Sequence, residues 1–407
     1  MTESPGDEPR DVPPFGDLMN EIPLFRELQR VLFSSTGPVN WELARQVAIA
    51  TASYGQDDPS PGPEDGQGLA ETVRAAELAV AEFTGLPSPS DLANVRAVRR
   101  SEWVAANVKD LADVLDPVAG KLASAIGEQG GMLPGLPGLS DLGLPAEEGA
   151  GRPDMMQLIV KQMAPLLMGV QIGSVLGVLA QGVLGQFDLP VPRPGGALLF
   201  VMPNISALER DWSLKPVDFR LWVVLHEVTH RFEFARSWVR PHFVALVTDL
   251  VEHAELDLAG MQQRFEGLDL SDPGAMSQAV EGMGNLFGQT SDPEQRLRIA
   301  RVQSFLAAAE GYGDHVSTAV GRRMLSTSGA IEEALRRHRE AGHTDKALER
   351  LLGIELTPTQ RGLGEEFCER VVRDTDEFTL ARMWESAEAL PSMPELEEPT
   401  LWLARTV

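Results

Sequence analysis

Apolar side chains recur at helical spacing along most of this chain. Four segments of the opening third carry apolar residues three or four positions apart, and these are Leu24 to Phe33, Trp41 to Tyr54, Leu69 to Phe83 and Trp103 to Ile126. That spacing puts the apolar side chains on one helix face, which can pack against a core. The pattern therefore predicts a helical layer in the N-terminal part.

The later part of the chain shows the same period over longer stretches. It predicts helices over Val217 to Trp238, Arg240 to Phe265, Asp292 to Met324, Ile331 to Ala341, Thr344 to Leu352 and Thr359 to Ser386. One short apolar run, Ala197 to Met202, has the length of a strand and stops at Pro203. We therefore expect a mainly α fold with little β-structure.

Two stretches rich in proline, glycine and aspartate interrupt the helices, at Gln56 to Gln67 and Gly127 to Pro153. Such stretches bury too little apolar surface to offset the entropy of an ordered backbone, so they predict loops or linkers. We place a disordered N-terminus at residues 1–16, a helical region at 17–153 and the metal-binding region at 154–407. The last two regions are expected to pack as one large domain.

One long segment, Met163 to Phe187, carries no charged side chain and is long enough to cross a bilayer. Gly169, Gly173 and Gly177 recur in it at every fourth position, which clears one helix face for a neighbouring helix. Polar side chains are also scattered through the segment. It is therefore predicted to be a buried central helix, with no membrane partner.

The charge of the chain argues against one class of function. With 60 acidic and 35 basic residues, the formal net charge is -25. Such a charge repels phosphates, so no nucleic-acid partner is expected. The one cysteine, Cys368, rules out an internal disulfide. The acidic, proline-rich start does not resemble a secretory signal, so a cytoplasmic location is predicted.

The predicted helix Val217 to Trp238 contains His226, Glu227 and His230 in the pattern H-E-x-x-H. Positions four apart project from one helix face, so both imidazoles can bind one tetrahedral zinc ion. Glu227 then lies beside the metal, where it can act as the general base for a bound water. Core or surface side chains are the alternative, but in so apolar a helix these groups need polar partners, which a metal supplies. The pattern therefore predicts a zinc site.

A catalytic zinc usually takes a third protein ligand, which the motif does not contain. Glu233 and Arg236 stand where a metzincin would carry its glycine and third histidine, so that class is excluded. Candidates in the next helix, at the distance where thermolysin-like enzymes often place a glutamate, are Asp249, Glu252, His253 and Glu255.

The preferred third ligand is Glu310, a carboxylate within an otherwise apolar helix. Asp314 follows one turn later on the same face, where it can accept a hydrogen bond from a ligand imidazole. The alternative for Glu310 is the exposed end of a solvated helix. Tyr312 and His315 are the candidates for the electrophile that stabilises the oxyanion of the reaction.

These motifs resemble those of a known family. The resemblance lies in the run from Asp218 to His230, in the pair Pro203-Asn204 after the apolar strand, and in the later segment Glu310-Gly-Tyr-Gly-Asp314-His-Val. They are similar to a bacterial family of zincin-like hydrolases, common in actinobacteria and often labelled as associated with coenzyme F420 biosynthesis. The resemblance extends from about the glycine-striped helix to the C-terminal helices.

The resemblance implies a mostly α-helical fold with a zincin active-site helix. It also implies that His226 and His230 are zinc ligands, that Glu227 is the general base and that Glu310 is the third ligand. The family label rests largely on the motif, so it supports the fold and the metal more firmly than any substrate.

Together these features predict a zinc-dependent hydrolase of the zincin type that cleaves an amide bond, most naturally in a peptide. The strand Ala197 to Met202 is expected to hold an extended peptide as an added strand. Two alternatives stay open: a non-catalytic zincin-like protein that binds a partner, and a hydrolase of a small amide or ester in cofactor metabolism. Four protein ligands without an open position would indicate the first, and a narrow pocket the second.

Overall fold

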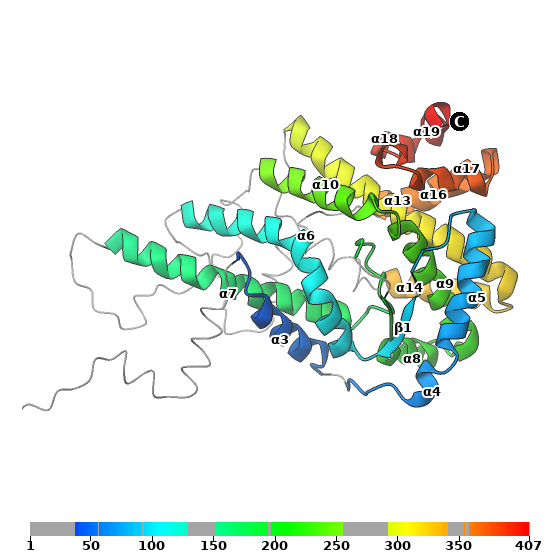
Figure 1. Ribbon diagram of the computed structural model, residues 1–407, viewed down its shortest axis with the longest axis horizontal. Helices are drawn as coiled ribbons and strands as arrows, with labels where there is room; N and C mark the ends of the chain where they lie inside the picture. Colours follow the sequence, from blue (N-terminus) through cyan, green and yellow to red (C-terminus); the bar gives the residue numbers. More distant parts are fainter. Residues whose placement is uncertain are drawn as a thin grey trace, which may run out of the picture.

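The fold of this chain is built from helices around a small pair of strands (Figure 1). The computed structural model describes residues 37–55, 57–91, 93–128, 152–193, 197–254, 292–340, 354 and 358–406. The helices there are α3 (Trp41–Ala52), α4 (Pro63–Gly66), α5 (Leu69–Thr84), α6 (Arg100–Glu128), α7 (Arg152–Ala180), α8 (Met202–Asp211), α9 (Pro216–Phe234), α10 (Val239–His253), α13 (Pro293–Met324), α14 (Ser328–Glu340), α16 (Pro358–Asp374), α17 (Glu377–Ala381), α18 (Met393–Glu397) and α19 (Pro399–Thr406). The strands are β1 (Asn94–Val98) and β2 (Ala197–Val201). The prediction of a mainly α fold with little β-structure is confirmed.

The C-terminal helices differ from the sequence prediction. One helix is predicted over Thr359 to Ser386, whereas the structure has α16 and α17 with a break between them. The break occurs because Asp376 adopts an extended backbone and its carboxylate caps α17, accepting a hydrogen bond from the amide of Thr379 at 2.7 Å. The predicted helices Leu24 to Phe33 and Thr344 to Leu352, like the N-terminus 1–16, lie outside the described residues.

The glycine stripe of α7 is the surface on which α3 packs (Figure 1). A Cβ added at Gly173 would lie 2.5 Å from the carbonyl oxygen of Ala44, and one at Gly177 would lie 2.4 Å from Cβ of Thr51. Gly169 approaches α3 in the same way. The expectation that the stripe admits a neighbouring helix is therefore confirmed. Among the residues described, no helix is both long and apolar enough to span a bilayer.

The strand β2 has a neighbour on each side. It pairs with β1 in parallel along its full length, and Gly185 forms an antiparallel bridge with Phe200 on the other side. The amide of Val201 also donates to the carbonyl of Leu184 at 2.8 Å. The expectation that this strand receives a peptide as an added strand is therefore wrong at Phe200, because both edges are occupied there. Sequence analysis did not predict β1, which is short and half exposed.

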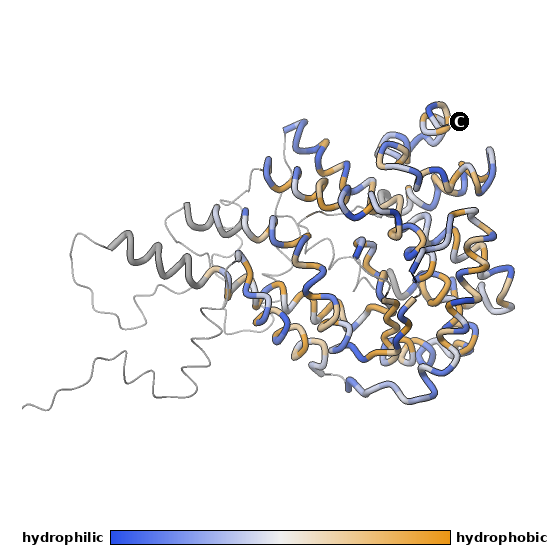
Figure 2. Tube along the Cα trace, viewed as in Figure 1, coloured by the Kyte–Doolittle hydropathy of each residue, from blue (hydrophilic) through white to orange (hydrophobic). Residues whose placement is uncertain are grey.

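Helix α9 runs through the core, where hydrophobic positions are concentrated (Figure 2). Every side chain from Trp222 to Phe234 is buried, including that of Arg231. Arg231 pairs with Glu77 of α5 and donates to the carbonyl of Asp91 at 2.6 Å. This cation therefore ties α9 to α5. The other polar side chains of the buried stretch must also find partners inside the protein.

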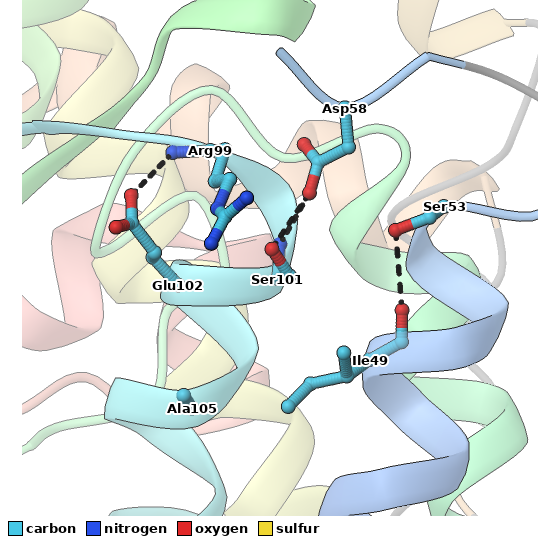
Figure 3. A pocket seen from close by; sticks show the side chains of 7 residues that line it. All are labelled: Ile49, Ser53, Asp58, Arg99, Ser101, Glu102 and Ala105. Atoms are coloured by element: carbon cyan, nitrogen blue, oxygen red, sulfur yellow. Dashed lines mark hydrogen bonds between the residues drawn. The ribbon is translucent and has the colours of Figure 1, made fainter. Parts of the chain in front are cut away.

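The start of α6 forms a surface hollow (Figure 3). Asp58 accepts hydrogen bonds from the amides of Arg100 and Ser101 and from the Ser101 hydroxyl, at 2.9, 3.1 and 2.7 Å. Glu102 accepts one from the amide of Arg99 at 3.1 Å. These carboxylates satisfy the first amides of the helix. The polar side chains of this hollow thus cap α6, and none of the predicted site residues lines it.

Helices α13 and α16 meet through glycines. A Cβ added at Gly364 would lie 1.8 Å from the carbonyl oxygen of Ala307, and one at Gly311 would lie 2.2 Å from the carbonyl carbon of Gly364. Backbone atoms cannot move aside as side chains can. We expect Gly364→Ala to lower the free energy of unfolding by about 3 kcal/mol, measured by denaturant unfolding.

The matched control for this prediction is Gly362→Ala in the same helix, where an added Cβ meets no atom within 4 Å. It should be neutral or stabilise the protein by up to about 1 kcal/mol, because alanine loses less backbone entropy on folding than glycine. A Gly364→Ala variant as stable as Gly362→Ala would contradict the close packing of α13 on α16.

Candidate metal centre

The two motif histidines lie together in the buried stretch of α9. The exposed fractions of His226, Glu227 and His230 are 5%, 1% and 0%. The imidazole ring centroids are 4.6 Å apart, with the ring planes at 87° to each other. Trp222 stacks on His226 and Phe234 stacks on His230, each at 5.5 Å between centroids. The stacked rings of Trp222 and Phe234 therefore hold both imidazoles in place.

His230 is oriented by a carboxylate one turn further along α9. Its Nδ1 lies 3.0 Å from Oε2 of Glu233, and both side chains are fully buried. In the neutral imidazole, an ionised Glu233, which can only accept, places the proton on Nδ1 and leaves the lone pair on Nε2. Among the described residues Nε2 is buried and has no hydrogen-bond partner. A histidine that binds a metal is commonly held by a carboxylate in this way.

Negative charge is concentrated around His230. Burial lowers the pKa of His230, but the charges of Glu233, Glu310 and Glu227 outweigh burial and raise it to about 9. Burial raises the pKa of Glu233 to about 7, against the opposing effect of His230. Burial, with the charge of Asp188, also raises the pKa of Glu227 to about 8. Several carboxylates around one imidazole favour a cation at this place.

Helix α13 crosses α9 at the two imidazoles. A Cβ added at Gly313 would lie 2.6 Å from Cε1 and 2.8 Å from Nε2 of His230, so the close approach depends on glycine. Glu310 and Asp314 flank Gly313 on the same face of α13. Oδ1 of Asp314 lies 3.8 Å from Nδ1 of His226, and Glu310 is near enough for its charge to act on His230. The structure thus brings both predicted carboxylates to the imidazole pair.

One structural observation supports the fit of this donor set to a zinc ion: Nε2 of His230 is buried and has no hydrogen-bond partner among the described residues. Imidazole nitrogens and a carboxylate oxygen are ligands that zinc prefers. As placed, no three histidine, cysteine, aspartate or glutamate side chains in the described ranges are spaced to hold a metal. The candidate holders are the imidazole pair and Glu310, whose charge acts on His230.

The α10 candidates for the third ligand lie elsewhere. Asp249 pairs with Arg298 at 3.4 Å and with His253 at 3.2 Å. Gly313, which contacts the His230 ring, lies 15 positions after Arg298 (313 minus 298). This separation is roughly 22 Å along a helix. The structure therefore does not bring Asp249 or His253 to the pair. Glu252 is exposed at the same end of α10, and Glu255 lies outside the described residues.

Tyr312 and His315 are engaged by other elements. The Tyr312 ring packs against Trp384 at 5.8 Å between centroids, and its hydroxyl hydrogen-bonds to Thr84. Nε2 of His315 lies 3.0 Å from a carboxylate oxygen of Glu377. Neither side chain is brought to the imidazole pair, because both lie on other faces of α13 than Glu310.

Glu227 is held by a backbone segment, residues 185–187. Its Oε2 accepts a hydrogen bond from the amide of Phe187 at 2.7 Å. A Cβ added at Gly185 would lie 2.2 Å from the Glu227 carboxyl carbon, so the segment rests directly on the carboxylate. Trp103 of α6 donates to the Gly185 carbonyl at 2.8 Å and fixes the segment. Oε1 of Glu227 is buried and lacks a hydrogen-bond partner in the described part of the chain, which leaves it available to a proton.

Comparison with known proteins decides the family. The family model for zincin-like metallopeptidases matches residues 39–403. The chain belongs to this family. The structure is also similar to a crystal structure from Chloroflexus aurantiacus, provisionally described as a hydrolase with a novel fold. The match covers 90% of this chain and 98% of that one, with a TM-score of 0.61 and 28% identity.

A search of curated proteins found no match. The family resemblance inferred from the motifs is confirmed by the match over most of the chain. Neither comparison concerns coenzyme F420, so that association stays a prediction.

Two parts of the candidate site were not predicted from the sequence. Glu233 follows His230 by three positions, so the spacing H-E-x-x-H-x-x-E already contained its signal. The segment 185–187 lies about 40 positions before Glu227. It acts through a backbone amide and a glycine, and such an interaction leaves no side-chain signal to find.

Proposed function

We propose that this protein is a zinc-dependent hydrolase that cleaves amide bonds in peptides. One observation carries the proposal: Nε2 of His230 and Oε1 of Glu227 are both buried without a hydrogen-bond partner among the described residues. The other polar atom of each side chain is held by Glu233 or by Phe187. Two preoriented, unpaired groups on one helix fit a metal ligand beside a general base.

His226, His230 and Glu310 would hold the zinc ion, with an open position for water or substrate. Asp314 would orient the imidazole of His226 and Glu233 that of His230, each from the Nδ1 side of the ring. When bound, zinc supplies a Lewis acid that lowers the pKa of a water from about 15.7 to about 7 and polarises the substrate carbonyl.

Glu227 performs the proton transfers. Its Oε1 takes a proton from the water that attacks the amide carbonyl carbon, while the hydrogen bond from Phe187 keeps Oε2 in place. The carbon–nitrogen bond then breaks, and Glu227 returns the proton to the leaving nitrogen. One water is consumed, and the products are a carboxylic acid and an amine. No oxidant or second substrate is needed.

Metal removal tests the proposed function. We expect the full chain, purified without chelators, to contain about one zinc per chain and to hydrolyse members of a fluorogenic peptide library. Dialysis against 1,10-phenanthroline should abolish hydrolysis, and about one equivalent of zinc should restore it. Elemental mass spectrometry on the same samples gives the metal content. Zinc-loaded protein that cleaves no amide would overturn the proposal and favour the non-catalytic alternative.

A further inference from the structure

A buried arginine, Arg193, lies next to the segment that holds the base. Only 5% of its surface is exposed. Its Nη1 donates to the amide oxygen of Asn107 at 2.8 Å and to the carbonyl of Gln186. Its guanidinium carbon lies 5.5 Å from the ring centroid of Trp103. These contacts fix the plane of the guanidinium but use only one of its three nitrogens.

The other two nitrogens of Arg193, Nε and Nη2, are buried and have no hydrogen-bond partner within the described ranges. They form one edge of the guanidinium, which presents two parallel N–H groups. That edge matches the two oxygens of a carboxylate. The charges of Glu227, Asp110 and Asp188 already act on this cation. Its two unpaired donors are costly when buried, and a bound carboxylate would satisfy both.

One peptide group connects Arg193 to the base. Its carbonyl, from Gln186, accepts from Nη1 of Arg193, and its N–H, from Phe187, donates to Oε2 of Glu227. The guanidinium and the Glu227 carboxylate are therefore separated in space by a single peptide group. Burial lowers the pKa of Arg193 to about 10, even with the opposing charge of Glu227 nearby, so the side chain stays cationic at neutral pH.

We propose that Arg193 binds a substrate carboxylate on the amine side of the scissile amide. In such a substrate only the amide nitrogen and one α-carbon separate the scissile carbonyl from the carboxylate, which matches the short separation of Glu227 and Arg193. The substrate class is then a peptide cut before its C-terminal residue, or an N-acyl amino acid. The inference rests on the proposed function and narrows it to substrates of this class.

The reaction is the hydrolysis already described, applied to this class. Water adds its oxygen to the acyl carbon, the carbon–nitrogen bond breaks, and the released amino acid takes the proton on its nitrogen. Its carboxylate stays paired with Arg193 until it leaves. Arg193 is thus a residue for substrate specificity, and it exchanges no proton.

Binding of matched acids and amides tests the role of Arg193 without turnover. The probes are N-acetyl-leucine and N-acetyl-glycyl-leucine, each compared with its C-terminal amide by calorimetry on zinc-loaded Glu227→Gln protein. We expect each acid to bind about 10- to 100-fold more tightly than its amide. In Arg193→Gln the ratio should fall to about one, and Arg193→Lys, which keeps the charge but loses the paired edge, should fall between.

Arg240→Lys is the matched control. Arg240 donates to the carbonyl of Pro192, the neighbour of Arg193, at 2.9 Å and pairs with Asp113 on the surface of α6, so it supports the same loop and its two contacts do not involve Nε or Nη2 of Arg193. Its acid-to-amide ratio should equal that of the parent protein. A lowered ratio in Arg240→Lys as in Arg193→Gln would show that only the loop structure matters and would overturn the proposal.

Two results separate this inference from the proposed function. An acid-to-amide binding ratio of about one in protein with Arg193 intact would overturn the Arg193 site, even if peptides are hydrolysed and even if the Arg193 variants fail to fold. Preferential binding of the acids would support the site even if no hydrolysis occurs. Rates of zinc-loaded protein with Glu227 intact on the two acids then distinguish a peptide from an N-acyl amino acid as substrate.

Discussion

Glu227→Gln is expected to lower kcat for amide hydrolysis by about 10²- to 10⁴-fold while zinc stays bound. The glutamine keeps the shape of the side chain, and its oxygen can still accept the hydrogen bond from Phe187. The segment 185–187 should therefore remain in place, whereas the proton of the attacking water has no acceptor. The measurement is kcat together with zinc content, on one preparation.

The matched control for Glu227→Gln is Glu102→Gln. Glu102 also accepts a hydrogen bond from a backbone amide, that of Arg99, but it does so at the start of α6. Its substitution should leave kcat unchanged. If Glu227→Gln hydrolysed peptides at the rate of Glu102→Gln, another group would have to be the base.

His230→Gln should reduce zinc from about one per chain to less than about a tenth, because it removes one of only two imidazoles in the donor set. Glu233→Gln should give a smaller effect, a loss of zinc affinity of about 10- to 100-fold. Glu233 only orients the His230 ring from Nδ1. Elemental mass spectrometry measures the zinc content, and competition with a fluorescent chelator measures the affinity.

Two further variants decide the third ligand. Glu310→Gln should lose zinc as His230→Gln does, whereas His253→Gln should keep it, since His253 lies on the exposed end of α10 beside Asp249. Zinc retained in Glu310→Gln but lost in His253→Gln would move the third ligand to α10.

The features of the candidate site that could be predicted from sequence depend on spacing within one helix. The H-E-x-x-H pattern places His226 and His230 on one face of α9, and the same rule places Glu310 and Asp314 on one face of α13. That α13 lies across α9 depends on packing between distant parts of the chain, which periodicity does not specify. The approach of these carboxylates to the imidazoles was inferred from residue type and from the family resemblance, not from periodicity.

The features that sequence analysis missed act over long distances or through the backbone. Arg193 stands alone between prolines, and nothing near it in sequence indicates that two of its guanidinium nitrogens lack partners among the described residues. Tyr312 and His315 were reasonable by residue type, but they lie about 200° and 140° around α13 from Glu310, at 100° per residue. Their faces pack against α5 and α17 instead.

Glycines on two faces of α13 determine how closely this helix packs against α9 at the candidate metal centre. Gly313 meets the His230 ring without a Cβ between them, and Gly311 meets the backbone of α16 at Gly364. At these two positions α13 has no side chain that could change rotamer to absorb a shift of the helix. Backbone packing therefore sets the distance of α13, and with it Glu310, from the imidazoles. Helix α16 fixes the position of α13 although it contributes no candidate ligand.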